Sequence, residues 1–396
     1  MRERRKGLSV HRTLGSLLFA ALLSGSLLYG IDYFYRNAME RGSALTGSFY
    51  IVAIIAALAV FVLLLFPANR PLKGIKNLLR WLLIIVAVVT VFGSGILWDL
   101  QGRMMYYPRP EDAGQTAKNQ QIPGLERLTV TDKSGAQYGG WLWKNTPGKA
   151  GLILYFGGNA EYAASSVASV AKRKGADQAF RGYNYLMMDY PGYGNSQGEP
   201  GEESIYRMAL ATWDAVVARE DVDPDRIVIA AWSLGTGTAT RLAAEKQPAG
   251  LVLMAPFYNG ATLVNGFANK MLKGTPGAIL GDEPFGPNDL LVRNRYRSDL
   301  YARQTPIHTL IVAASEDSMI PSHQAEKLAQ EYDSNQFVMV EGSHFEPYYG
   351  EQALPAIVVY LQGIGGGAPA LPEAPATTVS PAPVSAAPQP VTTAAP

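Results

Sequence analysis

The feature that most constrains the fold is an alternation of strand-like and helix-like segments between residues 149 and 361. The strand-like runs are apolar throughout, which predicts strands covered on both faces of a sheet. A repeated β-α series of this length predicts an α/β fold with a doubly wound, mostly parallel sheet. The expected strands are residues 151–156, 183–189, 226–231, 250–254, 308–313 and 336–340, and the expected helices are residues 162–173, 204–218, 236–245, 322–332 and 352–361.

Two segments depart from this alternation. Residues 125–131 and 136–143 read as two strands around a turn, which predicts an antiparallel opening to the sheet. Residues 259–305 form a connection too long for a simple crossover, and connections of this kind are usually lids or caps. A small cap or lid insertion is therefore expected there, with a disordered insertion as the alternative for its Gly- and Pro-rich part.

The first hundred residues contain three long apolar runs, at about residues 14–33, 48–66 and 78–97. Each is long enough to cross a hydrocarbon core of ~30 Å as a helix. Basic residues are concentrated before the first run and between the second and third, which places both segments in the cytoplasm by the positive-inside tendency. Three crossings then place everything after Leu100 on the periplasmic or exterior side of a bacterial inner membrane.

These runs divide the chain into a membrane anchor (1–103), a folded domain (104–362) and a Pro/Ala-rich tail (363–396) whose composition predicts disorder. The alternative for the first run is a cleaved signal peptide, which leaves the location of the domain unchanged. The absence of cysteine fits either side of a membrane. A formal net charge of +1, with no Lys/Arg stripe interleaved with aromatics in the second half, gives no support for a nucleic-acid partner.

Residues 226–240, RIVIAAWSLGTGTAT, read as a buried strand that breaks on a serine and continues as a helix. This places Ser233 at the apex of a sharp strand-turn-helix connection. A serine hydroxyl needs such an exposed position, with a base nearby, to act as a nucleophile. Ala231, Gly235 and Gly237 keep the turn uncluttered. The alternative is an ordinary loop with a serine at the helix N-cap.

A nucleophilic serine needs a base, and the chain has four histidines. His11 precedes an apolar run, His308 begins an expected strand and His323 begins an expected helix. His344 lies in the loop after the last strand, where a base can reach over the carboxyl edge of the sheet. His344 is therefore the expected base.

The orienting carboxylate is expected at a strand end between the serine and the base. Asp317 occupies such a position, with the neighbouring Glu316 as the reserve candidate. Asp189 ends an earlier strand but precedes Ser233, so it is interpreted as structural. For the oxyanion, the backbone N–H of Leu234 supplies one donor. The second is expected from Asn159, with Gly158 next, in the glycine-rich loop after residues 151–156.

Five segments of the chain contain or adjoin the candidate residues described above: FGGNAE (156–161), DYPGYGNSQGEP (189–200), WSLGT (232–236), SEDSMIP (315–321) and GSH (342–344). Together they resemble the successive motifs of the α/β-hydrolase superfamily. The resemblance covers roughly residues 104–361 and is nearest to the membrane-tethered α/β-hydrolase-domain serine hydrolases, a group that includes eukaryotic protein depalmitoylases and many bacterial members. It implies an eight-stranded sheet with Ser233, Asp317 and His344 as a triad. Ala231 and Gly157 stand where the family commonly has glycine and histidine.

The expected function is a membrane-anchored serine hydrolase that cleaves an ester, thioester or related acyl bond of a small or lipid-derived substrate. It requires no metal and no cofactor. The alternatives are an inactive binding or scaffolding module and a component of a transporter, and the near absence of ionisable residues in the apolar runs argues against the latter. Tyr258, Phe267 and Phe285 are candidates for an acyl pocket or for packing.

Overall fold

The computed structural model describes residues 82, 101–102, 105–273, 292–349 and 351–364. The three expected membrane spans lie outside these residues, apart from Leu82, as do Phe285 and most of the expected tail. Within the described residues, no helix combines the length and apolar character that a membrane crossing needs.

The described chain builds a single eight-stranded sheet with the strand order β1-β2-β4-β3-β5-β6-β7-β8. The strands from β4 to β8 in this order run parallel, and β1 and β2 add an antiparallel edge. This confirms the expected mostly parallel sheet and its antiparallel opening. The strands are β1 (Leu125–Thr131), β2 (Gln137–Trp143), β3 (Ala150–Phe156), β4 (Tyr183–Met188), β5 (Val222–Trp232), β6 (Gly250–Met254), β7 (Thr309–Ala314) and β8 (Asn335–Val340).

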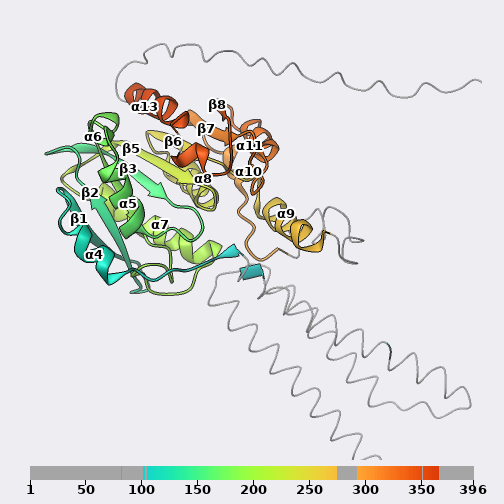
Figure 1. Cartoon of the computed structure of the whole chain (residues 1–396), viewed down its shortest axis with the longest axis horizontal. Coiled ribbons are helices and arrows are strands. Elements are labelled where there is room, and N and C mark those ends of the chain that lie inside the picture. The colour runs from blue at the N-terminus through green and yellow to red at the C-terminus, as the bar shows by residue number, and fades with distance from the viewer. Residues whose placement is uncertain (1–81, 83–100, 103–104, 274–291, 350, 365–396) are drawn as a thin grey trace, which may run out of the picture.

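Helices cover both faces of the sheet (Figure 1). Two separate apolar clusters fill the two interfaces, one with Leu154 and Leu242 and the other with Ile153 and Val167. The alternation of neighbouring strand residues between clusters follows from the period of two along a strand. The helices are α4 (Ala113–Asn119), α5 (Ala163–Lys172), α6 (Ala176–Ala179), α7 (Glu202–Val217), α8 (Gly235–Lys246), α9 (Gly260–Leu272), α10 (Ser298–Ala302), α11 (Ser322–Ala329), α12 (Glu346–Tyr349) and α13 (Ala353–Gly363).

One strand begins earlier than its sequence indicates. The sequence predicts a strand over residues 226–231, whereas β5 starts at Val222. Val222 pairs with Ala150, and the register then shifts so that Ile227 pairs with Leu152. Proline cannot donate a ladder hydrogen bond, so Pro224 falls within the irregular part of the strand.

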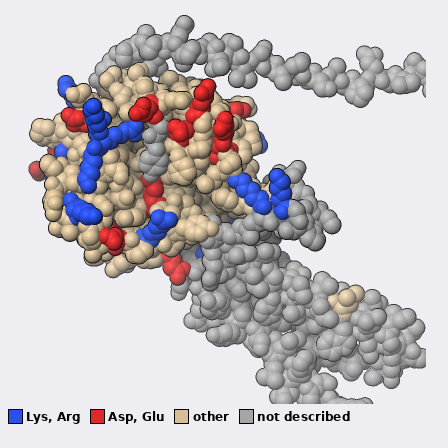
Figure 2. Space-filling view, viewed as in Figure 1, with Lys and Arg blue, Asp and Glu red and all other residues tan. Residues whose placement is uncertain are grey.

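The long connection after β6 is partly helical. Its first part forms α9, which Asn259 caps by accepting a hydrogen bond from the Thr262 N–H at 3.0 Å. Residues 274–291 of the expected cap lie outside the described residues. On the face of the domain seen in Figure 2, acidic and basic side chains are interspersed.

Candidate active site

Ser233 lies at the junction between the end of β5, Trp232, and the start of α8, Gly235. Its backbone has a φ of +52°, in the left-handed region that non-glycine residues rarely adopt. The Ser233 N–H donates to the carbonyl of Met254 at 2.9 Å, which holds the turn against β6. A strained turn between a strand and a helix is the geometry that presents a nucleophilic serine at the carboxyl edge of an α/β sheet.

Small residues allow this turn to pack tightly. A Cβ at Gly235 would overlap the carbonyl oxygen of Phe156, so α8 approaches the end of β3 as only glycine allows. Ala231 is fully buried in β5. Its methyl group is accommodated there.

His344 brings the other two expected residues together. Its Nε2 lies 2.9 Å from Ser233 Oγ, and its Nδ1 lies 2.6 Å from Asp317 Oδ2. All three side chains are buried, with residue exposures of 7%, 6% and 4% for Ser233, Asp317 and His344. The three residues proposed from the sequence therefore lie in one continuous chain of hydrogen bonds.

The hydrogen bonds to Asp317 set the direction of this chain. Its Oδ1 accepts the N–H groups of Met319 and Ile320, both at 2.8 Å. Because an ionised carboxylate only accepts, His344 Nδ1 must carry the proton that faces Oδ2. Nε2 is then an acceptor for the Ser233 hydroxyl, which is the tautomer that a general base needs.

The other candidates lie elsewhere. His308 Nδ1 is 2.8 Å from Ser334 Oγ, and His323 is exposed at the start of α11. His11 lies outside the described residues. Glu316 is exposed, and its N–H donates to the Gly342 carbonyl at 2.9 Å.

The backbone N–H groups of Leu234 and Asn159, the two expected oxyanion donors, make no hydrogen bond to another loop or turn carbonyl among the described residues. The Gly158 N–H, which was the reserve donor, instead donates to Glu161 Oε2 at 2.5 Å. Glu161 also accepts from the Tyr155 hydroxyl at 3.0 Å, so its carboxylate is held in place. Of the two candidates for the second oxyanion donor, Gly158 is therefore already paired and Asn159 is not.

Comparisons with known proteins bear on the fold. A model of the α/β-hydrolase fold matches residues 151–301. The chain also has a TM-score of 0.50 and 15% identity to the structure of a Pyrococcus furiosus esterase, over 66% of this chain and 98% of that one. The chain therefore has the α/β-hydrolase fold.

Two relatives indicate where similar sequences occur. An uncharacterized Mycobacterium tuberculosis protein is 29% identical over 270 residues, which is 66% of this chain and 88% of that protein. The α/β-hydrolase domain-containing protein 17B of Xenopus laevis is 35% identical over 77 residues, which is 19% of this chain and 27% of that protein.

The chain has glycine at position 157, where proteins of this fold commonly have histidine, and a larger side chain would meet close neighbours there. A Cβ at Gly157 would overlap the Met187 side chain and the Glu161 carboxylate. The Tyr190 hydroxyl donates to the Gly157 carbonyl at 2.7 Å. The Met187 and Glu161 side chains therefore occupy the space that a side chain at position 157 would need, and the Tyr190 hydroxyl hydrogen-bonds to the backbone there.

The Trp232 side chain contacts both the loop after β3 and the loop that carries His344, which the sequence analysis did not predict. A Cβ at Gly158 would overlap its ring, so the loop after β3 lies directly on the indole. Its Nε1 donates to the His344 carbonyl at 3.2 Å, and its ring stacks on Tyr348 at 5.4 Å between centroids. One ring thus supports both the loop that carries Asn159 and the loop that carries the candidate base. The residue was visible beside Ser233, but no sequence pattern indicates these contacts.

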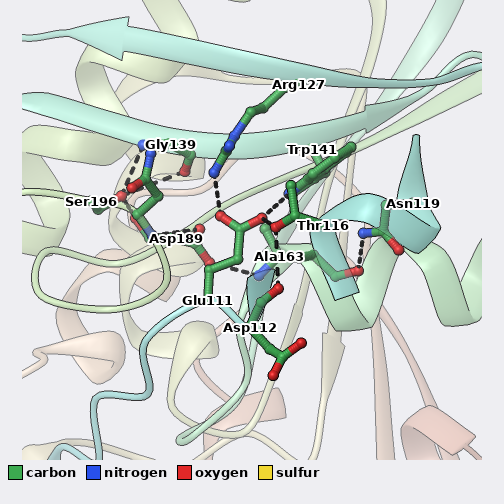
Figure 3. Close-up of polar contacts among 12 residues, drawn as sticks. Glu111, Asp112, Thr116, Asn119, Arg127, Gly139, Trp141, Ala163, Asp189 and Ser196 are labelled. Carbon is green, nitrogen blue, oxygen red and sulfur yellow. Dashed lines mark hydrogen bonds and ion pairs between the residues drawn. The ribbon is translucent and has the colours of Figure 1, made fainter. Parts of the chain in front are cut away.

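Asp189 is buried, and Figure 3 shows its carboxylate directed toward Ala163. Its Oδ1 accepts the Ala163 N–H at 2.6 Å, at the start of α5. Burial, with a smaller contribution from the Glu111 carboxylate, raises the pKa of Asp189 to about 6. These contacts support the structural role that the sequence indicated.

Replacing Asp189 with asparagine is expected to remove a pH-dependent loss of stability. The pKa of about 6 lies above the ordinary 3.8, so the folded protein binds a proton that the unfolded chain has lost. The contribution of Asp189 to the free energy of unfolding is therefore greatest below about pH 4. It falls by about 3 kcal/mol as the pH rises through 6. The measurement is denaturant unfolding of both proteins at pH 4 and pH 7. A difference between the two proteins that stays constant with pH would contradict the prediction.

Within the described residues, no group of three or more His, Cys, Asp or Glu side chains is arranged to hold a metal ion. Of the candidate pocket residues, Tyr258 donates its hydroxyl to Glu331 at 2.7 Å, and Phe267 packs against the core. Both contacts indicate packing roles for these two aromatic residues.

Proposed function

We propose that this protein is a membrane-anchored serine hydrolase that cleaves an acyl ester, thioester or related acyl bond. The observation that carries the proposal is the continuous hydrogen-bonded chain from Ser233 through His344 to Asp317, with 2.9 Å and 2.6 Å between the heavy atoms. These distances lie within the reach that proton transfer requires.

In the proposed mechanism, Ser233 Oγ attacks the acyl carbonyl while His344 Nε2 takes its proton. Asp317 stabilises the resulting imidazolium, and the N–H groups of Leu234 and Asn159 donate to the oxyanion. His344 then gives the proton to the leaving alcohol or thiol, and an acyl-enzyme remains on Ser233. Water, deprotonated by His344, attacks this acyl group, which leaves as a carboxylic acid and restores the serine.

Apolar side chains beside the site favour a substrate with an apolar acyl group. Phe345 follows His344 and is 49% exposed, and Met319 follows Asp317 by two residues and is 43% exposed. Exposed apolar groups at a site are a common means of binding apolar ligand surface. The solved esterase of similar fold makes carboxylic esters the first substrates to test.

Membrane anchoring rests on the three apolar runs at about residues 14–33, 48–66 and 78–97. Their length and the distribution of basic residues around them support three spans with the hydrolase domain on the periplasmic or exterior side. A lipid-derived substrate fits this arrangement.

The test is labelling of the full chain with fluorophosphonate probes, which react with activated serines. We expect labelling of the native protein and none of the folded Ser233→Ala variant. A membrane-impermeant probe is expected to label the native protein in intact spheroplasts as well as after lysis. Labelling only after lysis would overturn the outward location, whereas the absence of Ser233-dependent labelling would favour the inactive binding module.

A further inference from the structure

The segment that leads into the domain, residues 105–111, which we call the connector, is held firmly at its start. The Met105 and Tyr106 residues are only 2% and 4% exposed. The Tyr106 hydroxyl lies 2.8 Å from the hydroxyl of the buried Tyr296, which precedes α10. The N-terminal end of the connector is therefore anchored in the core, by a contact with a residue 190 positions later in the sequence.

The side chain of Asn159 pairs with the connector. Its Nδ2 donates to the Met105 carbonyl, and its Oδ1 accepts the Tyr107 N–H, both at 2.9 Å. These two peptide groups flank Tyr106, and the side-chain amide bonds to both as a neighbouring strand would. The Tyr193 hydroxyl donates a second hydrogen bond to Oδ1 at 2.9 Å and also accepts the Tyr107 N–H at 2.9 Å.

The backbone beside Asn159 needs this support. Ala160 has a φ of +65°, in the left-handed region, although it is not glycine. Such a conformation costs on the order of 1 kcal/mol or more and persists only where its surroundings hold it. The Ala160 N–H donates to Asn159 Oδ1 at 3.0 Å, so the same side chain that binds the connector also fixes the strained turn.

The far end of the connector is held equally well (Figure 3). Pro110 forms a bridge with Gly194, and the Glu111 carboxylate pairs with Arg127 and accepts the Trp141 indole N–H at 3.2 Å. The connector is thus held at both ends, and the Asn159 side chain is bonded to its N-terminal end.

We propose that the connector positions the oxyanion donor: Met105 and Tyr107, with Tyr193, hold the Asn159 side chain so that its backbone N–H faces the developing oxyanion. The inference rests on the proposed function, because it concerns the transition state of that reaction. The domain then depends on the segment that joins it to the N-terminal region for transition-state stabilisation. Misplacing a donor by about 1 Å can lower the rate by about a hundredfold.

Two pairs of variants test this in the full-length protein. Tyr107→Pro removes the N–H that Asn159 accepts, whereas Tyr107→Ala removes the same 57% exposed side chain and keeps the N–H. Asn159→Ala removes the whole side-chain amide and keeps the backbone donor. Tyr193→Phe removes one hydroxyl and is a mild change that preserves packing.

The readouts are kcat, KM and the affinity for a trifluoromethyl ketone, which forms a tetrahedral adduct with the serine. We expect Tyr107→Pro and Asn159→Ala to lower kcat by about tenfold to a hundredfold, with KM within about twofold, and to weaken ketone affinity in parallel. Tyr193→Phe is expected to lower kcat by about fivefold, and Tyr107→Ala to change it by less than about twofold. The pH profile stays unchanged because Asp317 and His344 are intact.

Several outcomes would overturn the inference. Equal losses in Tyr107→Pro and Tyr107→Ala would assign the effect to the side chain rather than to the N–H. A loss that appears in KM alone would indicate substrate binding. Unchanged kcat in both Asn159→Ala and Tyr193→Phe would refute the positioning role even if Tyr107→Pro fails to fold. Each of these results requires an active native protein, so failure of the proposed function is recognised separately by the absence of Ser233-dependent labelling.

Discussion

Replacing His344 with alanine is expected to lower kcat for an acyl ester by about 10⁶-fold. In the proposed mechanism His344 Nε2, which lies 2.9 Å from Ser233 Oγ, takes the serine proton. Triad residues act as a unit, so the loss of the base costs nearly as much as the loss of all three. The expected residual rate, about 10³-fold above water, comes from the oxyanion donors and substrate binding. The measurement is steady-state hydrolysis of a chromogenic ester by the purified full-length protein.

The matched control is His308→Ala. His308 lies 2.8 Å from Ser334 Oγ in an exposed contact, so its replacement is expected to change kcat by less than about twofold. A His344→Ala protein that retains more than about one hundredth of the native kcat would show that another group is the base. A large loss in the His308 variant would point in the same direction.

Local patterns were sufficient to predict the sheet and the residues of the candidate triad. The apolar run before Ser233 and the small residues after it define a strand, a turn and a helix. His344 and Asp317 follow at strand ends, where a parallel sheet brings side chains to one edge. Each of these inferences uses only neighbouring residues and the order of the elements along the chain. Such features can therefore be predicted from the sequence alone.

Contacts between distant segments were not predictable in the same way. The connector meets Asn159 through its peptide groups, and a peptide group is present at every residue, so no residue type marks the contact. The contact between Trp232 and the loop after β3 depends on how closely Gly158 lies over the indole ring. The earlier start of β5 at Val222 depends on a register shift against β3. Such features follow from three-dimensional packing and not from residue pattern.

The candidate triad and the candidate oxyanion loop are held in place by different kinds of contact. The triad depends on side chains that are chemically distinctive, and each has one evident partner. The oxyanion loop depends on backbone geometry that is strained at Ala160 and is held by Glu161, Trp232 and the Asn159 side chain. Substitutions in the loop are therefore expected to change the rate gradually, whereas substitutions in the triad are expected to abolish it.

Replacing Asp317 with asparagine is expected to lower kcat by about 10⁴-fold while leaving KM nearly unchanged. The asparagine oxygen can still accept the N–H groups of Met319 and Ile320, so the side chain keeps its place. Its NH₂ group then faces His344 Nδ1, which must become an acceptor. The proton moves to Nε2, and the imidazole can no longer take the proton of Ser233.

Glu316→Gln is the matched control, because it makes the same carboxylate-to-amide change one residue earlier on an exposed side chain. Its kcat is expected to remain within about twofold of the native value. Because Asp317→Asn preserves shape and the bonds that hold the loop, its folded fraction and melting temperature should stay close to native, so the lost rate reports the tautomer of His344. If Asp317→Asn kept more than about a tenth of the native kcat, the carboxylate would not be orienting the base. If Glu316→Gln caused the larger loss, the orienting role would belong to Glu316.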